Sequence, residues 1–446
     1  MWKEPDTRWS FHDENDPVAQ RTDLGVNLVE DFKYWKVYLL GLGFFGISVL
    51  WPLYNAYVPI FLKDFALPSF LIGLIMTIDN FFAIFMLPFI GTLSDQTRTR
   101  IGRRKPYILA GAPLGALFFA LIPLCKDLGS LALMMFVIIL MNFSMALFRS
   151  PLIAFMPDIT PSEKRSQANG IINFMGGFGA LLAYFAGKPL YDANKAYPFL
   201  AGAALMLLAN LLVVLFVDEP SQYRVKNEKL NVSDTLRRGS KELRENLRDV
   251  FASKEKSLMM MLASIFLWFV GFNAIETFFT SYAKFHMNIS ESTGALVLGV
   301  FSLSFMIFAL PSGFIGARLG RKKTIRLGLT IIVVCLLIAV VFSRLLRDSA
   351  LLFLFYLVFA ISGAGWALVN VNSLPMVVDM TRSEKVGGYT GLYYFFSMAA
   401  NIVAPPLAGA FIDLAGYGSL FVFSIVFLVT SYVTMGFVRR GERAES

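Results

Sequence analysis

Three ionisable residues, Asp79, Arg149 and Glu276, stand inside long apolar stretches of the sequence. A charge near the centre of a lipid bilayer costs at least about 2.5–3.5 kcal/mol, so such a side chain normally faces a cavity or a partner. Burial favours the neutral form of a carboxylic acid, and a nearby guanidinium favours its charged form. The chemistry open to these residues is therefore proton binding and release, together with hydrogen bonding to a polar solute.

Aromatic and amide residues recur at helical spacing around these three charges. Trp51 and Asn55 share one face of a helix, and Trp366 and Asn370 share a face of another. A sugar presents CH faces that stack on aromatic rings and hydroxyl groups that pair with amides and carboxylates. Each aromatic taken alone is better explained by helix packing, because the chain contains 44 Phe, but their convergence favours a sugar site. The residues expected to contact a solute are Trp51, Tyr54, Asn55, Asn142, Arg149, Phe272, Glu276, Trp366 and Asn370.

The elements that carry these residues are apolar enough to cross a membrane. Hydrophobic residues form 56% of the chain and charged residues only 16%, and the mean hydropathy is +0.62. Globular domains carry about 25% charged residues, and a membrane-spanning helix needs about 20 apolar residues. We therefore predict an all-α membrane protein of twelve spans. The spans are expected near 35–61, 69–94, 106–125, 130–157, 167–190, 197–217, 257–285, 292–317, 324–343, 350–378, 388–412 and 418–438.

An internal repeat divides these spans into two pseudo-symmetric halves of six. The segment at 158–164, DITPSEK, recurs at 379–385 as DMTRSEK, 221 residues later. A repeat of this size in an apolar chain is typical of transporters built from two related bundles. The expected units are a tail at 1–34, a six-helix bundle at 35–217, a linker at 218–256, a second bundle at 257–438 and a tail at 439–446.

The same offset relates the charged residues to amides in the other half. Glu276 corresponds to Asn55, and Arg149 corresponds to Asn370. These polar positions fall in spans 1, 4, 7 and 10, and this predicts one shared cavity between the two halves.

The distribution of basic residues predicts the orientation. With both termini in the cytoplasm, the cytoplasmic segments hold about 32 of the 40 Lys and Arg residues, and the outer loops hold about seven. This is the asymmetry that the positive-inside rule requires, so the net charge of +9 reflects topology rather than nucleic-acid binding. Residues 1–30 show no cleavable signal pattern. The compact loops indicate the inner (plasma) membrane of a bacterium.

Cysteine and histidine residues predict neither a metal site nor catalysis. Cys125 and Cys335 fall in predicted spans, His12 falls in a tail and His286 in an outer loop. The loops contain no phosphate-binding or nucleophile motif. We therefore expect no cofactor and no enzymatic activity.

The linker at 218–256 contains ten Lys or Arg residues. Within it, Val232, Leu236, Leu243 and Leu247 recur at helical spacing. This pattern fits an amphipathic helix on the inner membrane surface, with its basic face toward anionic lipid. A solvated tether whose charges only enforce topology fits it equally well.

The loop at 91–106, GTLSDQTRTRIGRRKP, combines an aspartate with glycines and arginines. Asp95 lies within reach of several arginines, so the cluster could latch helices at the cytoplasmic surface and release them during a conformational change. An arginine run alone would also fit an ordinary cytoplasmic loop. A counterpart without the aspartate, PSGFIGARLGRKK, occurs at 311–323. The expected gate residues are Gly91, Asp95, Arg98, Gly102, Arg103, Arg104, Asp158, Glu163, Asp379 and Glu384.

This loop, the twelve spans and the repeat resemble the major facilitator superfamily over residues 35–438. The ending GRRKPYI and the spacing from Pro151 to Asp158 resemble one branch. That branch holds the glycoside–pentoside–hexuronide:cation symporters and the plant-type sucrose carriers. The resemblance implies alternating access between two six-helix bundles, with a sugar bound midway between them and a cation carried along.

The sequence departs from both relatives. Sodium-coupled melibiose-type carriers have two acids in the second span at the positions of Ala83 and Leu87, whereas the acid here is Asp79. The sucrose carriers have an arginine at the position of Ile153, whereas the arginine here is Arg149. The melibiose-type sodium site is therefore not reproduced. We interpret Asp79 as the proton carrier, with a permanent Asp79–Arg149 ion pair as the structural alternative and Glu276 as a competing proton site.

These observations predict a secondary active transporter that imports a disaccharide or short glycoside with a cation, with a proton favoured over sodium. One chain would form a complete unit, so a monomer is expected to suffice. A lysolipid or drug transporter is an alternative, against which Arg149, Asn370 and Glu276 count. A non-transporting membrane sensor is another, although the tail after 438 is short.

Overall fold

The computed structural model describes residues 33–161, 164–220, 248, 255–345, 350–380 and 386–441. Within these ranges, twelve helical segments are long and apolar enough to cross a membrane. The predicted all-α class with twelve spans is therefore confirmed. The tail at 1–32 and most of the linker, including the proposed amphipathic helix, lie outside the described residues.

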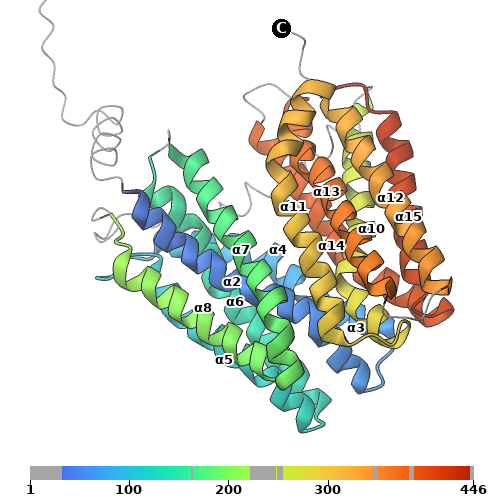
Figure 1. Ribbon diagram of the computed structural model, residues 1–446. Helices are drawn as coiled ribbons and strands as arrows, with labels where there is room; N and C mark the ends of the chain where they lie inside the picture. Colours follow the sequence, from blue (N-terminus) through green and yellow to red (C-terminus); the bar gives the residue numbers. More distant parts are fainter. Residues whose placement is uncertain are drawn as a thin grey trace, which may run out of the picture.

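The helices form two bundles that follow the two halves of the sequence (Figure 1). The first bundle contains α2 (Tyr34–Asp64), α3 (Ser69–Met76), α4 (Ile78–Gln96), α5 (Lys105–Asp127), α6 (Leu131–Ile159), α7 (Arg165–Ala193) and α8 (Tyr197–Phe216). The second contains α10 (Ser257–Phe285), α11 (Glu291–Leu319), α12 (Arg321–Leu345), α13 (Ala350–Val378), α14 (Val386–Ala415) and α15 (Ser419–Gly436).

The second span is interrupted at Thr77, between α3 and α4. The Thr77 hydroxyl donates to the carbonyl of Leu74 at 2.8 Å, which partly satisfies the backbone at the break. The sequence predicted one helix over 69–94. The interruption places Asp79 in the first turn of α4, where a carboxylate interacts favourably with the helix dipole.

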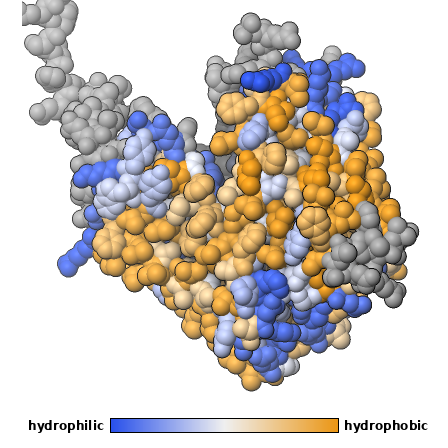
Figure 2. All heavy atoms as spheres, viewed as in Figure 1, coloured by the Kyte–Doolittle hydropathy of each residue, from blue (hydrophilic) through white to orange (hydrophobic). Residues whose placement is uncertain are grey.

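The bundles touch at one end and separate toward the other. We call the end where α2 begins and α15 ends the tail end, and the opposite end the far end. The basic residues predict that the tail end is cytoplasmic. Figure 1 shows the bundles converging at α3, at the far end, and Figure 2 shows the surface hollowed between them at the tail end.

Close backbone contact joins α3 of the first bundle to α14 of the second. A Cβ atom added at Gly409 would lie 2.2 Å from the carbonyl oxygen of Ser69, and one added at Gly73 would lie 2.3 Å from that of Pro405. Any larger residue would hold the helices apart, so these glycines permit the contact.

Each bundle has its own aromatic core. Tyr57 and Tyr191 stack at 4.0 Å between ring centroids in the first bundle, and Phe279 packs on Phe359 at 4.4 Å in the second. The outer surface carries an apolar belt with hydrophilic residues gathered toward both ends (Figure 2). Such a belt is what a hydrocarbon core about 30 Å thick requires.

Candidate functional site

Asp79 on α4, Arg149 on α6 and Glu276 on α10 lie deep in the molecule, between the bundles. Each is only partly buried, as expected for a side chain in a polar cavity. Arg149 faces the charge of Asp79, and Asp79 faces both Arg149 and Glu276. Within the described residues, Asp79 and Arg149 form no ion pair at 4.0 Å or less. The structure therefore brings the three charges together without locking Asp79 to Arg149.

Three buried polar atoms of the first bundle make no hydrogen bond of regular geometry among the described residues. These are Nε1 of Trp51, the hydroxyl of Tyr54 and Oδ1 of Asn142. The Asn142 amide donates to the carbonyl of Ile138 at 3.0 Å, which leaves its oxygen available. The Tyr54 hydroxyl lies beside Asp79 and Asn142. An unpaired buried polar group costs about 1–3 kcal/mol, so these atoms are suited to a polar ligand.

A hydrogen bond crosses between the bundles at the same level. The amide of Asn55 on α2 donates to Oε1 of Glu276 on α10 at 3.3 Å. One turn further, the hydroxyl of Thr280 donates to the carbonyl of Ala56 at 2.6 Å. Spans 1 and 7 are therefore in direct contact just on the far side of the three charges.

The wall of the second bundle is aromatic. Phe272 and Trp366 stack with ring centroids 4.1 Å apart and ring planes 5° apart. With Glu276 and Tyr184 they line a cavity that is partly open to its surroundings. Asn370 lies one turn beyond Trp366 on α13 and is half-buried, outside the lining of this cavity.

Tyr184 on α7 was not predicted from the sequence. It lines the cavity beside Glu276, and its Cβ would lie 2.7 Å from a Cβ atom added at Gly299 of α11. The repeat gave no signal for it, because the matching position in the second half is Pro405.

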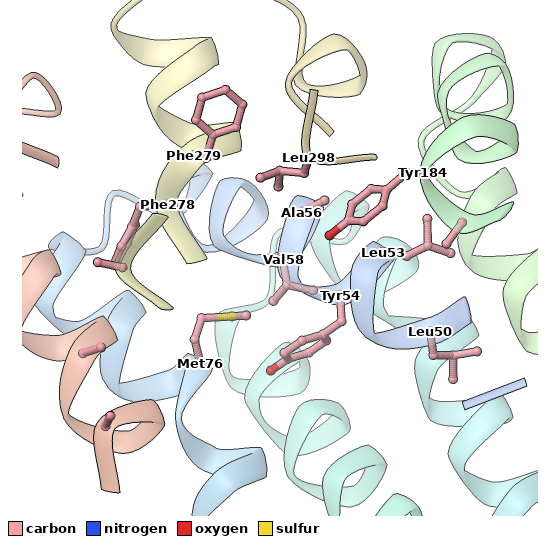
Figure 3. Close-up of a cluster of buried hydrophobic side chains, with 14 of the residues drawn as sticks. Leu50, Leu53, Tyr54, Ala56, Val58, Met76, Tyr184, Phe278, Phe279 and Leu298 are labelled. Carbon is pink, nitrogen blue, oxygen red and sulfur yellow. The ribbon is translucent and has the colours of Figure 1, made fainter. Parts of the chain in front are cut away.

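An apolar cluster closes the far side of the site. Figure 3 shows Tyr184 of the first bundle lying beside Leu298 of the second, within a buried cluster that also contains Leu53, Tyr54 and Phe279. All five side chains are at least nine-tenths buried. A solute in the cavity therefore has no aqueous path past them in this conformation.

The predicted gate at 91–106 forms a buried ion cluster at the tail end of the first bundle. Asp158 on α6 accepts from Nε of Arg103 at 3.1 Å and from Nε of Arg104 at 2.9 Å. Arg104 also donates to Asp95 and to Ser94 of α4. Burial lowers the pKa of Arg104, but the hydrogen bonds and charges of Asp158 and Asp95 outweigh that effect and raise it.

Other predicted gate residues act through backbone hydrogen bonds or close helix packing rather than through ion pairs with Asp158. Arg98 donates to the backbone carbonyl of Thr97 at 2.9 Å and to that of Asp95. A Cβ atom added at Gly91 would lie 2.9 Å from Oγ of Ser150, so α4 and α6 pack closely there. Glu163 and Glu384 lie outside the described residues.

Glu219, just after α8, completes the cluster and was not predicted. Its carboxylate accepts from the backbone N–H groups of Arg103, Arg104 and Lys105, at 2.6, 2.8 and 3.0 Å. These are the unpaired donors at the start of α5, where a carboxylate is favourable. Gly102 has a φ of 116°, and a Cβ atom there would lie 2.4 Å from the Glu219 carboxyl carbon. The turn therefore requires glycine.

The second bundle repeats this arrangement in reduced form. Arg321 donates to Asp379 and, at 2.8 Å, to the carbonyl of Pro375. Asp379 is the repeat counterpart of Asp158, and Gly320 has a φ of 85° like Gly102. The Arg103–Asp158 and Arg321–Asp379 pairs each lie within one bundle, so in this conformation they stabilise each bundle rather than join the two.

Two further aspartates join the bundles at the far end. Asp413 at the end of α14 accepts from the backbone N–H groups of Ser69 and Phe70, at 2.7 and 2.8 Å. Asp192 at the end of α7 accepts from the hydroxyl of Ser292 at the start of α11. The two aspartates are 221 residues apart, so one contact is the pseudo-symmetric copy of the other.

Ion pairs add to this closure. Lys284 lies 3.9 Å from Asp64 across the interface, and Lys195 lies 3.6 Å from Glu291. The molecule is therefore joined across its far end and open at its tail end.

Comparison with known proteins identifies the class of this molecule. The model of the Major Facilitator Superfamily matches residues 39–300 and 282–446. The chain belongs to this superfamily of membrane transporters, as the sequence motifs predicted, and it is a transporter rather than an enzyme.

Curated relatives are distant. The chain is 26% identical over 196 residues to proton-associated sugar transporter A of Mus musculus, covering 41% of this chain and 26% of that protein. It is 22% identical over 307 residues to the isoprimeverose transporter of Lactiplantibacillus pentosus, covering 65% and 60%. It is 21% identical over 397 residues to the quinolone resistance protein NorA of Staphylococcus aureus, covering 85% and 89%. The chain thus spans about a quarter of the first relative's length.

Solved structures share the fold. The nucleoside transporter NupG superposes with a TM-score of 0.71 at 14% identity, covering 91% of this chain and all of that one. A bacterial homologue of the lysosomal transporter Spinster, described as inward-facing and unoccupied, superposes at 0.67 with 13% identity, covering 93% and 99%. At these identities the likeness establishes the architecture alone.

Proposed function

We propose that this protein imports a sugar, a disaccharide or short glycoside, together with a proton, across the inner (plasma) membrane of a cell. The observation that carries the proposal is the presence of two unlike surfaces, one in each bundle, beside the three interior charges. The first bundle offers unpaired hydrogen-bonding atoms on Trp51, Tyr54 and Asn142, and the second offers the stacked rings of Phe272 and Trp366. A sugar needs both kinds of surface.

The proposed direction of transport follows from the predicted orientation. If the tail end is cytoplasmic, the conformation faces inward and its closed end faces the exterior. Alternating access would then open the far end by separating α3 from α14 and α7 from α11. One chain holds the whole path, so we propose that a monomer suffices.

Proton coupling is assigned to Asp79. Because Asp79 and Arg149 are close but not ion-paired, a solute that hydrogen-bonds to Arg149 would weaken the guanidinium's attraction for the carboxylate. Loss of that attraction favours the protonated acid. Sugar and proton would therefore bind cooperatively, and cooperative binding is what symport requires.

The names of two relatives support this proposal, one a proton-associated sugar transporter and the other an isoprimeverose transporter. A second candidate is the transport of drug-like molecules. It is favoured by the match to NorA over 85% of the chain and by the apolar side of the cavity. Glu276 and Arg149 count against it, because an apolar solute would displace water from both charges without offering either one a hydrogen bond.

The test is sugar-induced proton movement into proteoliposomes, with mono-, di- and trisaccharides, with and without Na⁺. We expect internal acidification with one class of sugar, independent of Na⁺. Asp79→Asn should abolish uphill accumulation while sparing the exchange of sugar down its gradient. Asp127→Asn, at the far end of α5, is the matched control and should behave as the unaltered protein does. Uphill accumulation in Asp79→Asn would exclude Asp79 as the carrier, and uptake that requires Na⁺ would exclude proton coupling.

A further inference from the structure

The cavity beside Glu276 continues into the interior of the second bundle. Its walls come from α10, α11, α12, α13 and α15, with Tyr184 contributed by α7. Figure 1 shows α12 and α15 on the side of this bundle away from the first bundle. The cavity therefore does not stop at the aromatic wall of Phe272 and Trp366 but extends past it toward the outer helices.

The deep part of this cavity differs chemically from its mouth. Glu276 and Tyr184 provide polar groups where the bundles meet, whereas the interior is formed by aromatic and branched side chains. We call this interior the side pocket; its residues are Phe301, Ile332, Leu336, Phe359, Ser362 and Leu428. The hydroxyl of Ser362 is buried, lies near the thiol of Cys335 and makes no hydrogen bond of regular geometry among the described residues.

The side pocket suits an aromatic group and not a second sugar ring. A sugar hydroxyl buried against these walls would lose its hydrogen bonds to water without replacement, which costs several kcal/mol in an apolar setting. An aromatic ring can pack edge-on or offset against Phe301 and Phe359. Cavities lined by Leu, Ile and Phe take up benzene for this reason. The hydroxyls of Ser302 and Ser362, which both line the cavity, can orient a polar atom of such a group.

We propose that the side pocket binds the apolar, aromatic aglycone of a glycoside whose sugar lies at the mouth, between Glu276 and the first bundle. The substrate class is then an aryl glycoside rather than an unsubstituted disaccharide. This inference rests on the proposed sugar transport and narrows it. The interface between the bundles would then recognise the sugar, and the interior of the second bundle would recognise the aglycone.

The experiment compares methyl and phenyl glycosides that share the same sugar and anomer. Both anomers of the glucosides, galactosides and xylosides are titrated into the purified protein by calorimetry. We expect at least one phenyl glycoside to bind ten or more times more tightly than its methyl counterpart. Leu336→Trp fills the side pocket from α12 and should reduce this ratio to about one while leaving methyl glycoside binding within twofold.

Leu337→Trp is the matched control, because Leu337 is the next residue on α12 and is 50% exposed on the lipid face. It should keep the full phenyl preference. Ile332→Trp fills the same pocket from one turn earlier on α12. It replaces Leu336→Trp in the experiment if thermal unfolding shows that Leu336→Trp does not fold.

Each outcome decides one of the two proposals. Equal binding of methyl and phenyl glycosides overturns the side-pocket assignment and leaves sugar transport standing. A phenyl preference that survives both pocket-filling variants places the aglycone elsewhere and also overturns it. Binding of a quinolone in the absence of any glycoside binding overturns the proposed sugar transport, and the aglycone assignment falls with it.

Discussion

Asn55 donates a hydrogen bond to Glu276 at 3.3 Å, and the two residues occupy the same position in the two halves of the repeat, 221 residues apart. A pseudo-two-fold axis brings equivalent residues face to face only where they lie near it. The pair therefore marks the point at which the two bundles meet around their common centre. Because this position is an amide in the first half and an acid in the second, the meeting point has one hydrogen-bond donor and one acceptor.

The Asn55–Glu276 hydrogen bond predicts that substitutions of Glu276 and of Asp79 affect proton-driven accumulation differently. Glu276→Gln removes the charge but keeps an acceptor for Asn55, so we expect proton-driven accumulation to persist with KM raised about tenfold, or about 1.4 kcal/mol. Asn55→Ala should raise KM similarly, because it leaves the acid unpaired. The measurement is sugar uptake against an imposed pH gradient. Loss of accumulation in Glu276→Gln, with accumulation retained in Asp79→Asn, would make Glu276 the proton carrier instead.

The far-end aspartates predict a shift in conformational equilibrium. Asp413→Asn weakens the acceptor for two N–H groups at the start of α3, where a negative charge typically contributes about 1 kcal/mol. The far end should then open about fivefold more often. Spin labels on Leu128→Cys and Leu414→Cys, at exposed positions in opposite bundles, would report a larger population at long distance.

Asp192→Asn should act in the same direction, because Asp192 makes the pseudo-symmetric contact to Ser292. Asp127→Asn is the control, since Asp127 lies at the same end without a cross-bundle contact among the described residues. An unchanged distance distribution in both variants would show that the aspartates do not stabilise the closed far end.

The close glycine contacts between α3 and α14 predict a larger opening of the far end than the aspartate substitutions produce. Gly409→Ala places a methyl group 2.2 Å from the Ser69 carbonyl oxygen, a distance at which α3 and α14 must separate. We expect uptake to fall by more than tenfold and the label pair to report an open far end. Gly391→Ala lies on the same helix with open space around its Cβ, so it should keep uptake within twofold. Normal uptake in Gly409→Ala would mean that the two helices do not approach this closely during transport.

The sequence predicted the fold because the features that define it are local or periodic. The amino-acid sequence alone shows the twelve apolar stretches, the basic loops and the offset of 221 residues. The Arg103–Asp158 contact was also within reach, since both residues belong to motifs that recur in the second half as Arg321 and Asp379. A contact between residues whose motifs recur in both halves can therefore be inferred from a single sequence.

Contacts whose residues do not recur in both halves were not predictable in the same way. Tyr184 enters the cavity because α7 packs on α11, and Glu219 caps α5 because α8 ends beside it. Neither residue has a periodic or repeated signal. Asp192 and Asp413 are related by the repeat, but the sequence does not say which helix start each one meets. The side pocket depends on how four helices of the second bundle leave space between them, a property that hydropathy does not record.

The two tail-end ion pairs predict unequal costs for equivalent substitutions. Asp158 holds two arginines whose side chains are 11% and 3% exposed, so Asp158→Ala removes the buried carboxylate of the cluster and leaves the more exposed Asp95 beside two buried positive charges. Breaking a buried pair in this way costs about 3–5 kcal/mol. Asp379 is 35% exposed and holds one arginine, and an exposed pair contributes at most about 1 kcal/mol. Thermal unfolding of the purified protein should therefore fall sharply for Asp158→Ala and little for Asp379→Ala, although the two residues are repeat counterparts. Equal losses would mean that the buried cluster is no more important to the first bundle than the single pair is to the second.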